Sequence, residues 1–470
     1  MNPLEISPAQ FRRLAERVTA ITAQYLEQID AQPIAPSTTG GESVRLFRAA
    51  LPEQGLGEDA FETLPDVMHL ARAQNGRFFG YVLGSGEPVA ALGDLFSSVL
   101  NQNVTAWRSG PAAVTIEQTV VGWLAEAIGC ASFRGHLTGG GSSANLMGLA
   151  MARETKLPAN EKGVADGGVV YASEEIHMSI PKSVALLGLG RENLRLIPVD
   201  ASFHMIPEEL EILIVRDAAV GKTPLAVVAS AGTVNTGAID PLRKIADIAH
   251  RHGAWFHVDG AYGALAAIAA RQKFDGLELA DSISLDPHKW LYQPLDCGCL
   301  LYRSSDAAQK AFSHSGDYAR SLTEDPIEGF AFFEESLELS RRFRALKLWL
   351  SLCYHGMAAF RASIAADLAH AQRLAESIRA HDQLELVAAG ELSAVCFRHS
   401  GKNGMSEQDL NQFNLALLKR VVRRGRVYLS NASLQGKFCL RACIVNHRTK
   451  DADVDSVVPE VLAAAEQVDR

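Results

Sequence analysis

The sequence contains no apolar run long enough to cross a membrane. The longest run, AYGALAAIAA, extends from Ala261 to Ala270, whereas a membrane-spanning helix needs about 20 apolar residues. The N-terminal segment mixes acidic and basic side chains and has no apolar core of the kind that a signal peptide carries. We therefore expect a cytoplasmic protein that does not associate with membranes.

The chain also has few cysteines and fewer basic than acidic side chains. The seven cysteines are odd in number and form no CxxC pair, which argues against a disulfide framework and a structural zinc site. The 14 histidines include no HExxH motif, so a zinc enzyme is a weak alternative and we expect no metal. Lys and Arg number 45 against 54 Asp and Glu, so we expect no nucleic-acid partner.

The chain divides into three stretches by composition and pattern. At about 150 residues per domain, its length corresponds to roughly two or three domains. Residues 1–88 predict an N-terminal helical arm. In residues 89–350, short Val- and Ile-rich runs alternate with amphipathic helical patterns, which is typical of an α/β domain with a mostly parallel wound sheet. Residues 351–470 predict a small C-terminal α+β domain.

The expected elements can be given as ranges. The predicted strands of the large domain are 168–171, 194–199, 225–230, 254–258, 282–285 and 298–302. In the best-marked helix, Asp240 can act as the cap, Pro241 takes the first helical position, and Gly253 ends the helix. The C-terminal part predicts a long helix over 341–380 and strands at 384–387, 394–398, 426–429 and 438–444.

Polar residues follow the predicted strands at their carboxyl ends, where an open parallel sheet binds its ligand. They are Glu174, Glu175, His177, Ser230, Thr233, Asp259, Asp286, His288 and Lys289. Taken alone, Asp259 is more often a helix cap or a structural ion pair, and Lys289 a solvated loop residue. A buried lysine beside a histidine can have a lowered pKa, however, and then acts as a nucleophile or an imine-forming amine.

The segment His136 to Leu146 (HLTGGGSSANL) contains a glycine-rich turn that leads into a helical pattern. Such a turn at a helix N-terminus offers free N–H groups to a phosphate, although it is equally consistent with a plain turn and cap. It has neither GK[ST] nor GxGxxG spacing, so ATP and NAD are secondary candidates. Together, a phosphate cradle, a carboxylate, a histidine and a lysine match the needs of pyridoxal 5'-phosphate (PLP).

The same residues resemble a known family, the group II, fold type I PLP-dependent amino acid decarboxylases, which include the aromatic amino acid and glutamate decarboxylases. The densest matches are DSISLDPHKWLYQPLDCGCLLYR (281–303), the segment 232–263 with HVDGAYG, GHLTGGGSSANLMGLAMAR (135–153) and SRRFRALKLWLSLCYHG (340–356). The resemblance extends over most of the chain and implies the fold type I architecture, a small-molecule L-amino acid substrate and a homodimer.

The resemblance also implies a role for individual residues. Lys289 would form the Schiff base with PLP, Asp259 would pair with the pyridine nitrogen, and His177 would stack on the ring. The further cofactor contacts implied are Gly141, Ser142, Thr233, Ala261 and His288, with Ser340 reaching the phosphate of a partner subunit. Tyr318 matches the loop tyrosine that protonates the α-carbon, which favours decarboxylation, because aldehyde-forming members carry Phe there.

The sequence departs from the aromatic-type enzymes at two places. Asp286 stands where these enzymes often have Asn, so it receives no phosphate contact. The implied substrate wall consists of Tyr81, Val82, Leu83 and Thr105, and the last three replace larger rings or proline. Tryptophan and smaller or acidic amino acids therefore remain open as substrates. An aldehyde-forming enzyme or carbon–carbon lyase with PLP, and a catalytically inactive binding protein on the same fold, are the competing hypotheses.

Overall fold

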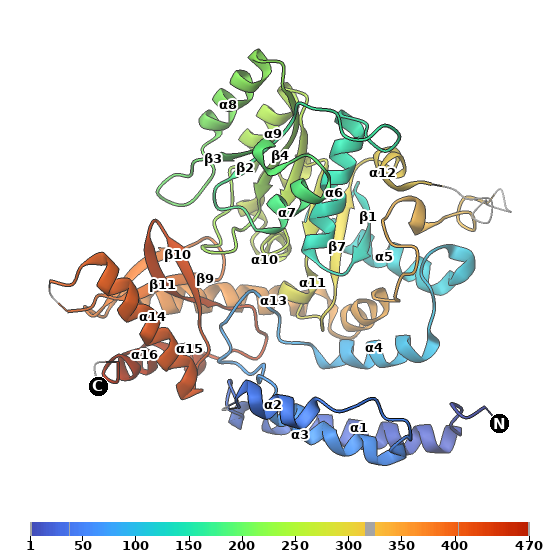
Figure 1. The fold of residues 1–470 in the computed structure, drawn as a ribbon, viewed down its shortest axis with the longest axis vertical. Helices are drawn as coiled ribbons and strands as arrows, with labels where there is room; N and C mark the ends of the chain where they lie inside the picture. Colours follow the sequence, from blue (N-terminus) through green and yellow to red (C-terminus); the bar gives the residue numbers. More distant parts are fainter. Residues whose placement is uncertain (1, 37, 315–324, 403, 469–470) are drawn as a thin grey trace.

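The computed structural model describes residues 2–36, 38–314, 325–402 and 404–468 and contains two β-sheets. Figure 1 shows the larger sheet, with strand order β1-β7-β6-β5-β4-β2-β3, at the opposite end of the molecule from the N-terminal helices. Its strands are β1 (Arg134–Thr138), β2 (Gly168–Ser173), β3 (Leu194–Ile197), β4 (Thr223–Ser230), β5 (Trp255–Asp259), β6 (Ser282–Leu285) and β7 (Gly298–Tyr302).

Most neighbouring strands of this sheet are parallel. The pairs β3–β2, β2–β4, β4–β5 and β5–β6 run parallel, whereas β7 is antiparallel to both β6 and β1. The predicted mostly parallel α/β fold is therefore confirmed. All six predicted strands of this domain are present. The seventh strand, β1, leads into the glycine-rich turn and is not predicted from the sequence.

Both faces of the sheet are buried, which explains why its strands are continuous apolar runs. In β2, Val169 and Tyr171 belong to one apolar cluster and Val170 and Ala172 to another, as the two-residue period of a strand requires. One face is covered by α5 (Pro111–Ala127), α8 (Pro207–Ala219) and α9 (Leu242–Arg251). The other is covered by α6 (Gly141–Lys156), α7 (Ser179–Leu186) and α12 (Ser305–Phe312).

Helix α9 is present, but it begins at Leu242, one residue later than predicted, and its cap differs from the expectation. Pro241 occupies the N-cap position, and no side chain caps the helix. Asp240 is buried and instead accepts hydrogen bonds from the backbone N–H groups of Met205 and Ser230, each at 2.7 Å. The carboxylate thus joins the end of β4 to a neighbouring loop. The two backbone N–H groups are buried and need a protein acceptor, whereas the exposed end of a helix can bind water.

The C-terminal part forms a four-stranded antiparallel sheet with strand order β10-β11-β9-β8. Its strands are β8 (Leu384–Ala389), β9 (Ala394–His399), β10 (Ser430–Leu434) and β11 (Lys437–Cys443), and its helices are α14 (Glu407–Arg424), α15 (Asp451–Asp455) and α16 (Val457–Ala465). The strand predicted at 426–429 is wrong, because β10 begins at Ser430. Tyr428 pairs its backbone with Arg77 and Phe79 instead.

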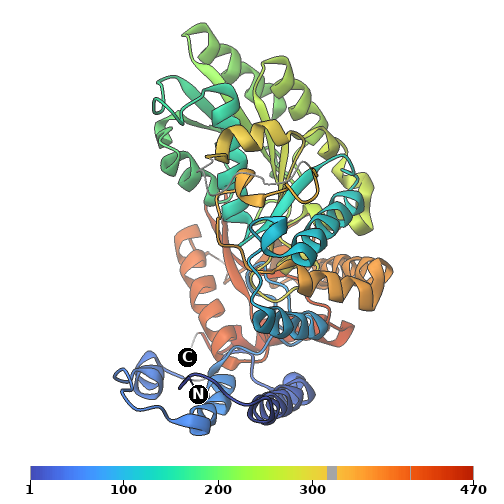
Figure 2. The ribbon, with the colours of Figure 1, turned by 90° about the vertical axis from the view of Figure 1, so that its right-hand side faces the viewer.

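Long helix α13 (Ala345–Arg379) contacts elements of both parts, with a break at Gly356, where φ is 75°. The N-terminal residues form α1 (Pro8–Gln28), α2 (Gly40–Phe47), α3 (Leu64–Leu70) and α4 (Pro88–Leu100). Figure 2 shows α1 to α3 at the edge of the molecule, and α1 buries none of its residues. Among the described residues, no helix combines the length and the apolar character that crossing a bilayer requires.

Candidate active site

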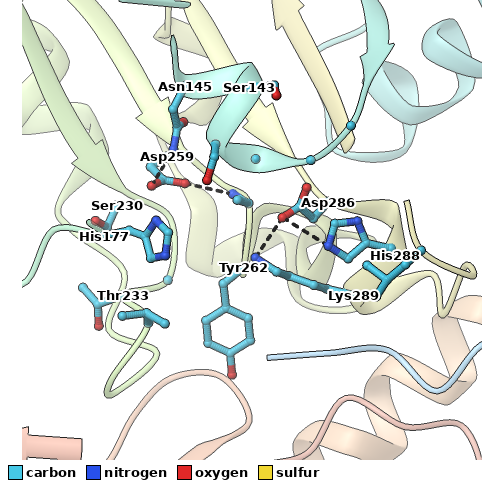
Figure 3. Close-up of a pocket in the computed structure, with 18 residues that line it drawn as sticks. Ser143, Asn145, His177, Ser230, Thr233, Asp259, Tyr262, Asp286, His288 and Lys289 are labelled. Atoms are coloured by element: carbon cyan, nitrogen blue, oxygen red, sulfur yellow. Dashed lines mark hydrogen bonds and ion pairs between the residues drawn. The ribbon is translucent and has the colours of Figure 1, made fainter. Parts of the chain in front are cut away.

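A cavity of about 300 Å³ lies at the carboxyl ends of β4, β5 and β6, beside the N-terminus of α6. Strand ends converge there because parallel strands share one carboxyl edge. Figure 3 shows side chains from several elements around this space. Eight of the predicted cofactor-site residues line it, namely Gly141, Ser142, His177, Thr233, Asp259, Ala261, His288 and Lys289.

Five of the remaining predicted residues do not line this cavity. Ser340 is exposed and lines a separate surface hollow together with Arg341. Tyr81 is 47% exposed, and its hydroxyl lies 2.9 Å from that of Tyr428. Val82, Leu83 and Thr105 are likewise absent from the lining of the cavity. Tyr318 falls outside the described residues. The roles of these residues remain predictions.

Lys289 projects from a single helical turn, α11 (Pro287–Trp290), that begins two residues after β6 ends. The proline at its first position fixes the backbone, which aims the lysine at the cavity. Lys289 Nζ lies 2.8 Å from Asp286 Oδ2, and His288 Nε2 lies 3.6 Å from the same oxygen. Asp286 Oδ1 is buried and has no hydrogen-bond partner among the described residues. A polar atom left unpaired in this way indicates that the cavity is built for a polar ligand.

Asp259 ends β5 and presents its carboxylate to the cavity. Oδ2 accepts a hydrogen bond from Asn145 Nδ2 at 3.0 Å, and Oδ1 accepts from Ser284 Oγ at 3.1 Å and from the Ala261 N–H at 3.2 Å. All three donors to this buried carboxylate are neutral groups. A carboxylate held in this way is oriented by the fold and keeps lone pairs available for a further donor.

His177 lies in the loop after β2, immediately before α7. Its Nδ1 accepts from the Ser179 N–H at 3.2 Å and lies 2.8 Å from Ser179 Oγ. Burial lowers the pKa of His177, an effect that the nearby Asp259 carboxylate partly offsets. The ring is therefore neutral near pH 7 and, because Nδ1 accepts, carries its proton on Nε2.

The glycine-rich turn forms a tight cradle at the N-terminus of α6. Gly140 has φ 137°, a conformation that L-residues with side chains avoid. A Cβ on Gly141 would lie 2.6 Å from Ala261 Cβ and 3.0 Å from Asp286 Oδ2, so only glycine fits. No side chain caps this helix, and its first N–H groups face the cavity edge, where they suit a phosphate.

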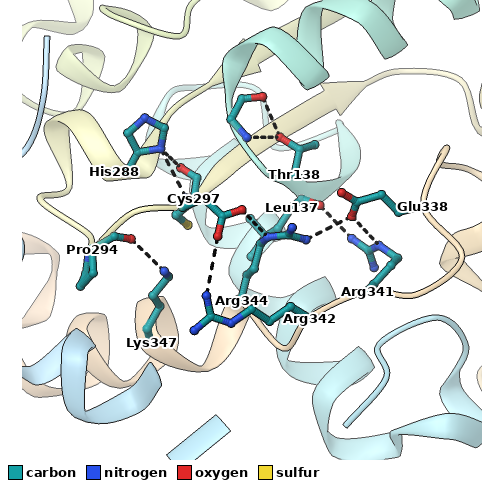
Figure 4. A network of polar contacts seen from close by, with 12 residues as sticks. Leu137, Thr138, His288, Pro294, Cys297, Glu338, Arg341, Arg342, Arg344 and Lys347 are labelled. Carbon is teal, nitrogen blue, oxygen red and sulfur yellow. Dashed lines mark hydrogen bonds and ion pairs between the residues drawn. The ribbon is translucent and has the colours of Figure 1, made fainter. Parts of the chain in front are cut away.

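A buried polar network around Arg341 lies beside the turn, and Figure 4 shows the contact of Arg341 with Leu137. Arg341 Nη2 lies 2.5 Å from Glu117 Oε1, and both side chains are at most 1% exposed. Arg341 also donates to the carbonyl oxygens of Val104 and Leu137, each at 2.9 Å. Because Leu137 lies in β1 just before the turn, the network joins the turn to the segments that carry Thr105 and Ser340.

The N-terminal segment that carries Tyr81, Val82 and Leu83 is attached to α11. The Gly84 N–H donates to the His288 carbonyl oxygen at 3.0 Å. A Cβ at Gly84 would lie 2.4 Å from that oxygen and 2.6 Å from the Lys289 carbonyl oxygen. The close approach therefore requires glycine at this position.

Asn145 and Tyr262 also line the cavity, and the sequence alone predicts no role for either. Asn145 is buried and contacts Asp259, and its position three residues after Ser142 on a helix is the signal that could have identified it. Tyr262 lines the cavity and stacks on Trp290 with ring centres 6.0 Å apart. No local pattern distinguishes Tyr262 from a core residue.

Together, the fold and the site define a PLP-dependent enzyme of fold type I. A lysine, a carboxylate, a neutral histidine and a glycine-rich turn at a helix N-terminus surround one cavity at the carboxyl edge of a mostly parallel sheet. Residues 45–400 match the pyridoxal-dependent decarboxylase conserved domain. The chain belongs to this family, and its cofactor is PLP.

Individual relatives agree with this assignment. An aromatic-L-amino-acid decarboxylase of Bacillus atrophaeus is 32% identical over 99% of this chain and 97% of its own length. A phenylacetaldehyde synthase of Petunia hybrida is 32% identical over 93% of this chain and 91% of its own. A crystal structure of Oryza sativa TDC with PLP and tryptamine superposes with a TM-score of 0.92 at 28% identity, covering 99% of both chains. The protein is a PLP-dependent carboxy-lyase of amino acids.

Proposed function

We propose that this protein removes the α-carboxyl group of an aromatic L-amino acid as CO2, with Lys289, Asp259 and His177 as its central catalytic residues. The observation that carries the proposal is the convergence of these three side chains on one cavity that also contains an unpaired buried carboxylate oxygen. The relatives named for aromatic substrates support the substrate class.

Each residue has a physical task in this proposal. Bound PLP supplies an electron sink for the charge left on the α-carbon when CO2 departs. Lys289 Nζ would hold the cofactor, and the first N–H groups of α6 would donate to its phosphate. Asp259, oriented by its three donors, would accept a hydrogen bond from the protonated pyridine nitrogen. His177 would cover one face of the ring and, being neutral, would add no charge there.

The outcome after loss of CO2 depends on where a proton is delivered. We propose that Tyr318 donates the proton to the α-carbon, because it resembles the loop tyrosine of the family. Amine formation follows from that assignment. The aldehyde-forming reaction is the second candidate, because a phenylacetaldehyde synthase is among the similar proteins.

The proposal includes a homodimer that acts in the cytoplasm. Helix α1 buries none of its residues, and α4 exposes five large apolar side chains, Leu92, Leu95, Phe96, Val99 and Leu100. A second copy would cover these surfaces and bring Ser340 toward the neighbouring site. The seven cysteines are all free thiols, as a reducing compartment favours. Light scattering should give twice the 50.7 kDa chain mass.

The direct test is to load the protein with PLP, add pooled amino acids, and follow CO2 and product amines by mass spectrometry. A new amine made by the native protein and absent with Lys289→Ala would identify both the reaction and the substrate. Aldehyde with ammonia would favour the second candidate. A native protein that binds no borohydride-reducible PLP would refute the proposal.

A further inference from the structure

A chain of hydrogen bonds runs through the interior of the sheet to the catalytic groups. It contains Trp255 and His257 of β5, Ser282 of β6 and Asn145 of α6, all at most 4% exposed. His257 and Ser282 are register partners in the parallel β5–β6 pair. The cavity is not lined by Trp255, His257 or Ser282, and the proposed function assigns no role to them.

One end of the chain is Trp255. Its indole Nε1–H can only donate, and it lies 2.8 Å from Ser282 Oγ. Ser282 Oγ accepts there and also lies 2.8 Å from His257 Nδ1, to which it can donate its own hydrogen. Burial lowers the pKa of His257 to about 4, so the ring is neutral near pH 7.

The other end of the chain sets the donor direction. The Asp259 carboxylate can only accept, so Asn145 must face it with Nδ2, 3.0 Å away. Asn145 Oδ1 then faces His257 Nε2 at 2.9 Å and needs a hydrogen from it. A neutral His257 therefore carries its proton on Nε2 and accepts at Nδ1 from Ser282, so every donor in the chain points toward Asp259.

The chain branches at Asn145 and reaches the second catalytic group. Asn145 Nδ2 also donates to Ser179 Oγ at 2.9 Å, and Ser179 Oγ lies 2.8 Å from the accepting Nδ1 of His177. The same amide thus orients the carboxylate at one side of the cavity and the histidine at another (Figure 3). Because its Nδ1 accepts, the neutral His177 carries its proton on Nε2.

The packing around His257 is adapted to this arrangement. A Cβ on Gly148 of α6 would lie 2.7 Å from His257 Cε1 and 3.2 Å from Ser282 Oγ. The helix can approach the strand closely enough for Asn145 to reach His257 only because Gly148 has no side chain. The helix gives up about 1 kcal/mol of propensity relative to alanine at that position.

We propose that His257 is a positioning residue that fixes the orientation of the Asn145 amide and, through it, the hydrogen bonds of both Asp259 and His177. This inference rests on the proposed roles of Asp259 and His177 toward PLP. Without the Nε2–H of His257, Asn145 Oδ1 is buried and unpaired, and the amide is free to turn away from Asp259. The carboxylate becomes more basic, draws the ring-nitrogen proton to itself, and the electron sink weakens.

The first measurement is made on the protein without cofactor. Nitrogen NMR of 15N-histidine-labelled protein, assigned with His257→Gln, should show His257 neutral and protonated on Nε2 from about pH 6 to 8. A resonance pattern for protonation on Nδ1, or for a charged ring at pH 7, would refute the inference. This result does not depend on catalysis, so it stands apart from the proposed function.

The second measurement is a pH titration of the visible absorbance of the loaded protein. In His257→Phe, the pH midpoint of the absorbance change should rise by about one pH unit. The value of kcat should fall roughly ten- to a hundredfold with little change in KM. Both effects are on the scale of one hydrogen bond to a charged group. His257→Gln, which retains a donor for Asn145, should recover most of the loss. The matched control is His136→Phe, because His136 is equally buried in β1 and has no hydrogen-bond partner among the described residues.

The possible outcomes separate the two hypotheses. If the native protein forms no lysine-linked PLP, the proposed function fails. If it does, but His257→Phe and His136→Phe behave alike, only the inference fails. Should His257→Phe not fold, Trp255→Phe tests the same chain from its far end. That variant should move the midpoint in the same direction by a smaller amount, and an unchanged midpoint would count against the inference.

Discussion

Replacing Gly141 with alanine should weaken PLP binding while leaving the fold intact. The added Cβ would lie 2.6 Å from Ala261 Cβ, whereas two carbon atoms in contact prefer about 3.5–4.0 Å. An overlap of about 1 Å with an atom attached directly to backbone has to be relieved by moving the turn. Overpacking of this kind costs about 1–3 kcal/mol. Because we propose this turn as the phosphate cradle, we expect PLP affinity to fall roughly 5- to 150-fold.

Absorbance titration with PLP measures this loss, and thermal unfolding of the cofactor-free protein checks the fold. Gly122→Ala in α5 is the matched control, since its Cβ would meet no atom within 4 Å and alanine favours a helix by about 1 kcal/mol. The control should bind PLP normally and unfold at the native temperature or slightly above it. If Gly141→Ala binds PLP as tightly as the control, the cradle has been placed wrongly.

Two predictions concern stability. Arg341→Met leaves the Glu117 carboxylate buried and uncompensated, so urea denaturation should show a loss of about 3–5 kcal/mol, and adding Glu117→Gln should restore part of it. The hydrogen bond to Glu391 and the contact with Asp200 raise the pKa of His204 to about 9. Its stabilising contribution is therefore complete below pH 6.5 and should disappear between about pH 6.5 and 9. His204→Gln should flatten that part of the profile, and an unchanged profile would show that the contacts contribute nothing.

The sheet and the strand-end residues could be predicted because their signals are local. Strands buried on both faces appear as short apolar runs, and the residue that follows such a run lies at the ligand edge, as Asp259 does and as Lys289 nearly does. The family motifs around the same positions strengthened that prediction. These motifs are local because a residue that follows the end of a strand lies at a fixed distance from the cavity.

The hydrogen-bond chain behind Asp259 could not be predicted in the same way. Trp255, Ser282 and Asn145 come together only through the register of β5 with β6 and the approach of α6, and neither is encoded within a short window. The error at β10 has a similar cause, because Tyr428 finds its backbone partners at Arg77 and Phe79, about 350 residues earlier in the chain.

The contact of Gly84 with α11 has a consequence for redesigning specificity. Replacing the segment 81–83 with that of a relative also affects the neighbouring backbone contact between Gly84 and α11, the helical turn that carries Lys289. Any graft whose boundary replaces Gly84 with a larger residue pushes against the carbonyl groups of His288 and Lys289. Loops can be exchanged productively only when the junction lies before this glycine.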